Sequence, residues 1–132
     1  MEGASKGCKE HNGLVVGILP QIDEKTSLAN PYLDVAIPTN TGWTRNSFVA
    51  MASDGLIIIG GKVGTMSEIA FGWMYDKSMI SLDNTAIPKD RWGRKVANTA
   101  LDDRRSDNIR GIAEPEQAVL ELIKLIKLDQ KE

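Results

Sequence analysis

The chain has 132 residues, of which 42% are hydrophobic and 26% charged, and its net charge is −2. This composition is typical of one folded globular domain over residues 1–132 and excludes a disordered protein. The charge gives no basic surface for nucleic acid, so no nucleic-acid partner is expected. No apolar run is long enough to cross a bilayer and the first residues lack a signal region, which predicts a cytoplasmic protein with no membrane partner.

Metal and disulfide chemistry are limited by residue counts. Cys8 is the only cysteine and His11 the only histidine. One chain therefore offers neither a disulfide nor a Cys/His metal site, and we expect no metal and no required cofactor.

The first half of the chain alternates predicted helices and strands that are joined by polar turns. In chain order these are a helix over residues 2–12, a strand over 14–19, a loop over 21–31, a strand over 34–38 and a helix over about 43–53.

The second half continues the alternation around an irregular segment. In chain order we expect a strand over residues 56–59, a helix over 65–76, a strand over 78–82, an irregular segment over 83–108, a strand over 109–113 and a helix from 114. The unbroken apolar run at 56–59 predicts a strand buried on both faces. We interpret 83–108, which contains a helical part near 90–100, as a solvated surface excursion, with a lid as the alternative. The last helix is apolar around much of its circumference, which suggests a subunit contact.

This alternation predicts an α/β fold, a doubly wound, Rossmann-like parallel sheet with helices on both faces. The turn at residues 60–65 then lies at the carboxyl end of its strand, where ligands bind. Its glycines let a ligand approach the backbone, Lys62 adds a positive charge, and the next helix begins there, so a phosphate suits the place. A tight structural turn with an outward lysine is the alternative. The turn at residues 39–42 should share this edge of the sheet.

Two charged residues are candidates for chemistry. Glu68 would stabilise positive charge developing at an anomeric carbon, and Arg45 would bind phosphate or orient a leaving base. The alternatives are structural. Thr65 and Glu68 also fit a capping box with Thr65 as the N-cap, and Arg45 would then pair with Glu68 or with a surface acid.

The segment from Gly60 to Ile69, preceded by Arg45-Asn46 and by residues 53–57, resembles the superfamily of LOG-type phosphoribohydrolases. The branch of molybdenum-cofactor carrier proteins looks closest. The likeness runs from Met1 nearly to the C-terminus.

The resemblance implies roles for particular residues. Arg45 and Glu68 correspond to the catalytic pair that cleaves the N-glycosidic bond of a nucleoside 5′-monophosphate. Lys62 stands where the enzymes usually have glycine. The residues that would hold phosphate or nucleotide are Thr39, Asn40, Thr41, Gly42, Asn46, Gly60, Gly61, Lys62, Gly64 and Thr65.

The resemblance also implies an N-terminal truncation of the Rossmann-like domain. The chain begins where the family has already formed two strands, one helix and its first glycine-rich loop. We expect the missing first strand to belong between the strands at 14–19 and 34–38, which would leave open sheet edges. Either the sheet re-pairs within the chain, or another subunit covers the edge, or the gene is a truncated natural one. We favour a homo-oligomer, a dimer or tetramer, that covers this gap.

The function expected from these points is binding of a small phosphate-bearing ligand: a nucleotide, phosphate or molybdenum cofactor. One alternative is an active phosphoribohydrolase acting on a nucleoside 5′-monophosphate. The other is a non-catalytic assembly module with a degenerate site.

Overall fold

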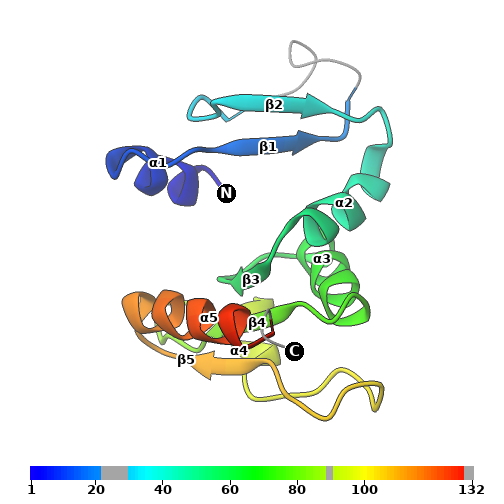
Figure 1. Ribbon diagram of the computed structural model, residues 1–132, viewed down its shortest axis with the longest axis vertical. Coiled ribbons are helices and arrows are strands. Elements are labelled where there is room, and N and C mark those ends of the chain that lie inside the picture. Colours follow the sequence, from blue (N-terminus) through cyan, green and yellow to red (C-terminus); the bar gives the residue numbers. More distant parts are fainter. Residues whose placement is uncertain (22–29, 89–90, 130–132) are drawn as a thin grey trace. The chain divides into compact units, whose positions relative to one another are not determined.

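A computed structural model describes residues 1–21, 30–88 and 91–129 (Figure 1). The predicted loop at 21–31 therefore lies mostly outside the described residues. The chain divides into two compact units, an N-terminal unit, Met1–Phe48, and a C-terminal unit, Val49–Glu132. Each is described by itself, and the single domain expected over 1–132 stays a prediction.

The N-terminal unit contains two short strands that pair directly. Its elements are α1 (Glu2–Glu10), β1 (Val16–Leu19), β2 (Val35–Pro38), the 3-10 helix η1 (Gly42–Thr44) and the start of α2 (Arg45–Ala52). β1 and β2 run parallel, with Val16 opposite Val35 and Ile18 opposite Ile37 (Figure 1). The expected gap between these two strands is therefore wrong, because their backbones already bond to each other.

Polar contacts hold much of the N-terminal unit together. The carboxylate of Asp34 accepts hydrogen bonds from Lys9 Nζ at 2.7 Å and from the Val15 amide at 2.8 Å. The bond from Lys9, followed by that from Val15, lowers the pKa of Asp34. The two strands bury little apolar surface, since the side chains of Val16 and Ile37 are 48% and 45% exposed.

The C-terminal unit contains a three-stranded parallel sheet in the order β3 (Gly55–Ile58), β4 (Ser78–Leu82), β5 (Arg110–Ile112). All residues of the central strand β4 are buried. β3 is an edge strand, and Ile57 is 37% exposed. The predicted burial of this segment on both faces is therefore wrong, while that of β4 is confirmed.

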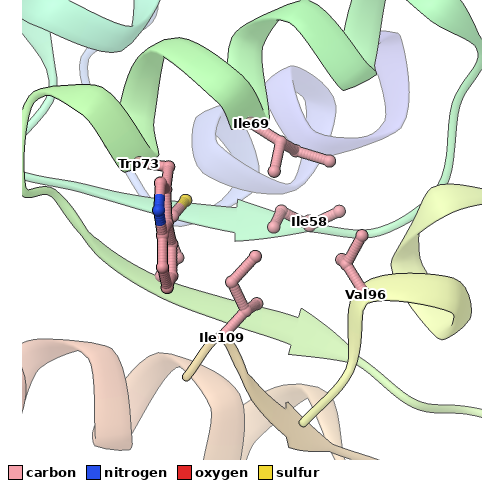
Figure 2. Packing of buried hydrophobic residues seen from close by; sticks show 6 residues of the cluster. Ile58, Ile69, Trp73, Val96 and Ile109 are labelled. Carbon is pink, nitrogen blue, oxygen red and sulfur yellow. The ribbon is translucent and has the colours of Figure 1, made fainter. Parts of the chain in front are cut away.

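Helices cover both faces of this sheet, as the three-layer prediction requires. On one face, side chains of α3 (Val63–Met74) and α4 (Trp92–Val96) pack with the sheet, and Figure 2 shows Ile69 and Trp73 directed toward Ile58 and Ile109. On the other face, α5 (Pro115–Asp129) packs through Ala118 and Leu122. Adjacent residues of β4 alternate between the two faces, because Met79 belongs to the first cluster and Ile80 to the second.

The segment between β4 and β5 is part of the core. Ile87, Gly93 and Val96 are buried, so the predicted surface excursion is wrong for these residues. Val96 enters the first cluster, and Ile87 enters the second. This irregular segment therefore contributes buried side chains to both faces of the sheet, Ile87 on the face of α5 and Val96 on the face of α3.

Residues 98–107 tie this segment to its neighbours. Asn98 covers the outer edge of β5: its amide donates to the Ile109 carbonyl at 2.7 Å, and its side-chain oxygen accepts from the Gly111 amide at 2.9 Å. The indole of Trp73 donates to Asp102 at 2.7 Å, and the Arg105 guanidinium lies 4.6 Å from the centre of the same ring. Among the described helices, none has the length and apolar character needed to cross a membrane.

Candidate functional site

The candidate site in the C-terminal unit is the turn at residues 60–65, hereafter the glycine turn. β3 ends at Ile58 and α3 begins at Val63, so the turn follows the carboxyl end of a parallel strand. Gly61 has φ +120°, and a Cβ on it would lie 1.9 Å from Thr65 Oγ1. Both the backbone conformation and the space therefore require glycine at position 61.

The start of α3 differs from the predicted capping box. Lys62 is the N-cap, and its own side chain makes no capping hydrogen bond. Thr65 is the third helical residue and Glu68 lies in the second turn, so the prediction of Thr65 as the N-cap is wrong. The first helical bond runs from the Met66 amide to the Lys62 carbonyl at 3.1 Å. The positive end of the α3 dipole therefore lies at the glycine turn.

The start of α4 lies against the same turn. A Cβ on Gly60 would be 3.6 Å from the Arg91 Cβ, and one on Gly93 would be only 2.6 Å from the Ile59 carbonyl oxygen. The buried Ser81 hydroxyl donates to the Gly93 carbonyl, which fixes α4 to the centre of the sheet. Glycine at 93 thus allows the close approach that brings Arg91 beside Gly60.

Arg91 is a residue that our sequence analysis missed as a site candidate. It is partly buried, and no hydrogen bond or ion pair of its side chain is recorded within the described part of the chain. Its neighbour Arg94 is already engaged, with Asp83 at 3.7 Å and the Ile87 carbonyl at 3.4 Å. The cluster of basic residues near 91–95 was visible in the sequence, but its position beside the glycine turn depends on packing.

The second predicted turn, at residues 39–42 of the N-terminal unit, uses its polar groups internally. The amides of Thr39, Asn40 and Gly42 donate at 3.0 Å to the carbonyls of residues 19, 21 and 20 respectively. The Thr39 hydroxyl donates to the Leu19 carbonyl at 2.7 Å and lies 2.8 Å from the Thr41 hydroxyl. These bonds fix the turn at the carboxyl ends of β1 and β2, and phosphate binding by these residues stays a prediction.

Arg45 and Asn46 begin α2. Arg45 Nε is buried, and no hydrogen-bond partner for it is found among the described residues. Asn46 is 5% exposed. A buried guanidinium nitrogen without a partner is costly, and a bound anion would remove that cost. Arg45 belongs to the N-terminal unit and Glu68 to the C-terminal unit, so their joint catalytic role stays a prediction.

A metal site finds no support in the described residues, where no group of three or more His, Cys, Asp or Glu side chains is placed to hold an ion. The chemistry available at the glycine turn is that of an anion site. It consists of the α3 dipole, the Lys62 ammonium and the Arg91 guanidinium, without a carboxylate cluster to bind a cation.

Residues 1–119 match the SLOG cluster4 family. An uncharacterized protein of Archaeoglobus fulgidus is 44% identical over 82 residues, which are 62% of this chain and 52% of that protein. A cytokinin riboside 5′-monophosphate phosphoribohydrolase of Mycobacterium marinum is 30% identical over 89 residues, 63% of this chain and 48% of the relative. The chain thus spans about half the length of the curated relatives it matches.

A solved structure gives the same result for the fold. The molybdenum cofactor binding protein of Rippkaea orientalis superposes with a TM-score of 0.72 and 30% sequence identity, covering 96% of this chain and 70% of that protein. The Rossmann-like fold class is thereby confirmed. The chain belongs to the SLOG cluster4 family, within the superfamily of LOG-type phosphoribohydrolases and molybdenum-cofactor carrier proteins.

Proposed function

We propose that this chain binds a phosphate-bearing small molecule, a nucleotide or a cofactor, at the glycine turn. The observation that carries the proposal is Gly61, whose φ of +120° and contact with Thr65 admit no side chain. Position 61 is restricted to glycine because Thr65 fills the space that its Cβ would take, and the turn that this glycine allows leads into α3, whose positive dipole end favours an anion.

Two cations support the same proposal. Lys62 is exposed, and its side chain makes no capping hydrogen bond to α3. Arg91 lies beside Gly60, the first residue of the same turn. Lysine supplies a mobile point charge and arginine a planar pair of donors, so together they would neutralise a phosphate dianion.

The names of the similar proteins support the ligand class. One refers to a riboside 5′-monophosphate and the other to a molybdenum cofactor. We propose a nucleotide, phosphate or molybdenum cofactor as the ligand and the cytoplasm as the compartment. We also expect a homo-oligomer.

A second candidate is phosphoribohydrolase activity, and the buried, unpartnered Arg45 Nε favours it. In this reaction Arg45 would hold the substrate or assist departure of the base. Glu68 would stabilise the oxocarbenium-like transition state through its carboxylate. The relatives called phosphoribohydrolases support this candidate.

A thermal-shift titration of the purified chain tests both candidates. The probes are adenosine 5′-monophosphate, ribose 5-phosphate and inorganic phosphate, and chromatography detects free base in the same samples. A ligand that binds only the folded state raises Tm. We expect Lys62→Ala to reduce the shift and Lys124→Ala, an exposed lysine on α5, to leave it unchanged.

The outcomes separate the candidates. A shift without released base supports a binding protein. Released base that is lost in both Arg45→Ala and Glu68→Ala, with unchanged circular dichroism, supports the enzyme. No shift with any probe overturns both and leaves the non-catalytic assembly module.

A further inference from the structure

The last helix, α5, has two apolar stripes, only one of which contacts the sheet. The inner stripe packs on β3 and β4 through Ala118 and Leu122, which are buried, with Leu125 and Ile126 partly buried beside them. These four side chains make the contacts that dock α5 on its face of the three-stranded sheet.

The outer stripe faces away from the sheet. Val119, Leu120 and Ile123 are 45%, 55% and 43% exposed. At about 100° per residue Leu120 and Ile123 lie roughly opposite the inner stripe, and Val119 lies between them and the edge of the inner stripe. Glu116 in the first turn and Lys127 in the last turn lie on the same side of the helix. We call these five residues the outer stripe.

The outer stripe is complementary to itself when a second copy runs antiparallel. If Leu120 lies opposite the partner's Ile123, then Glu116 lies opposite the partner's Lys127, because both pairs are centred midway between residues 121 and 122. A two-fold axis at that point repeats each contact twice. Apolar residues then meet at the centre and opposite charges meet at both ends.

The charges at the two ends are available for such a contact. Among the described residues, no hydrogen bond or ion pair is recorded for the side chain of Glu116 or Lys127. Glu121, which lies off the outer stripe, is by contrast already paired with Arg110 at 2.5 Å and with Lys124 at 3.4 Å. Within the described part of α5, the antiparallel arrangement therefore brings together two charges for which no ion pair is recorded.

We infer that the outer stripe of α5 is a homodimer interface in which two copies of α5 pack antiparallel across a two-fold axis. The family match ends at residue 119, so most of this surface lies beyond it. The inference does not depend on ligand binding at the glycine turn. A single helix pair is smaller than the interfaces of about 1,200–2,000 Å² that make stable complexes, so dimerisation is concentration-dependent.

Sedimentation velocity of the full chain, over a concentration series from micromolar to submillimolar, tests the interface. We expect a monomer–dimer equilibrium that Leu120→Asp weakens by about tenfold or more, because a charge would be buried at the centre of the contact. The matched control is Leu128→Asp. Leu128 is also exposed, at 61%, and also on α5, but lies about a third of a turn from the outer stripe.

A charge exchange tests the register and separates it from the helix dipole. Glu116→Lys and Lys127→Glu each place the wrong sign at an end of α5, so each also destabilises the helix. Combining them makes the dipole effect worse but restores opposite charges across the two-fold axis. We therefore expect each single variant to weaken dimerisation and the double variant to recover it, while its Tm stays low.

Three outcomes overturn the inference. The first is a monomer at every concentration, which would mean that the outer stripe does not bind a second copy of this chain. The second is equal weakening by Leu120→Asp and Leu128→Asp. The third is a double charge variant that dimerises no better than the single variants, which reduces the two charges to partners of the helix dipole.

Discussion

The two units of this chain are stabilised in different ways. In the C-terminal unit a parallel sheet is covered on both faces, and two apolar clusters contain its buried side chains. In the N-terminal unit two paired strands leave Val16, Val35 and Ile37 between 43% and 48% exposed. Its contacts include polar bonds at Asp34 and at Thr39. The comparison shows that, among the described residues of the N-terminal unit, a strand pair with short helices buries too little to form a core of the same kind.

The largest test of this difference removes a side chain from each unit. Trp73→Ala should lower the free energy of unfolding by about 4 kcal/mol, because the ring is 2% exposed and holds Asp102 and Arg105. Val16→Ala, at a half-exposed site, should cost less than about 1 kcal/mol. Urea unfolding followed by circular dichroism measures both values. Equal losses would mean that the strands of the N-terminal unit are covered as well as α3 is.

The next test concerns the glycine turn. Gly61→Ala should lower the free energy of unfolding by about 3 kcal/mol, through its φ of +120° and its overlap with Thr65. Gly60→Ala is the control, because its Cβ would meet Arg91 at an ordinary 3.6 Å. Thermal melts of both variants test the expectation. A Gly61→Ala variant as stable as the parent would mean that the turn is not fixed by this glycine.

Two glycines, one in each unit, allow a comparison of packing, because a Cβ added to either would lie at the same distance from its nearest neighbouring atom. A Cβ on Gly93 would lie 2.6 Å from the Ile59 carbonyl oxygen, and one on Gly17 would lie 2.6 Å from Leu33 Cδ1. The carbonyl belongs to the backbone beside β3, while the leucine tip can rotate away. We expect a loss of about 2 kcal/mol for Gly93→Ala and less than about 1 kcal/mol for Gly17→Ala in chemical denaturation. The reverse order would contradict the looser packing of the N-terminal unit.

The smallest effect is the pH dependence of the N-terminal unit. The bond from Lys9, then that from Val15, lowers the pKa of Asp34 below its ordinary value of 3.8. The folded state therefore binds this proton less readily, and the stabilisation is present above pH 3.8 and lost as the pH falls through the folded pKa. Asp34→Asn should lower Tm at pH 7, and the difference from the parent should narrow in acid. A difference in Tm that stays constant as the pH falls would contradict this expectation.

The order of elements was predictable because each has a local signal. Pro115 marks the start of α5, and the apolar run at 78–82 marks the buried strand β4. The pairing of strands has no such signal. The gap between β1 and β2 came instead from the family resemblance, which implied a missing strand at that place. Exposure of Ile57 was also unpredictable, because an edge strand and a central strand can have the same apolar sequence.

The site was predictable to the level of the glycine turn and no further. The glycines marked the strand-to-helix junction, but a Thr-x-x-Glu pattern placed the helix start at Thr65 instead of after Lys62. The Thr-x-x-Glu pattern gave the wrong start because a helix can begin at a residue whose side chain does not cap it, and Lys62 is such an N-cap. Arg91 escaped notice since its approach to Gly60 depends on the contact between Gly93 and β3, which spans more than thirty residues of sequence.

The cover that Asn98 provides on β5 has a consequence for how this protein would misassemble. With the amide and carbonyl of Ile109 and the amide of Gly111 already bonded, that side of the sheet is a poor template for an added strand. Cross-β growth or strand exchange starting from the C-terminal unit must then begin at β3. Replacing Asn98 by a residue that cannot bond to Gly111 would expose the Gly111 amide on this edge, while the backbone bonds to Ile109 remain.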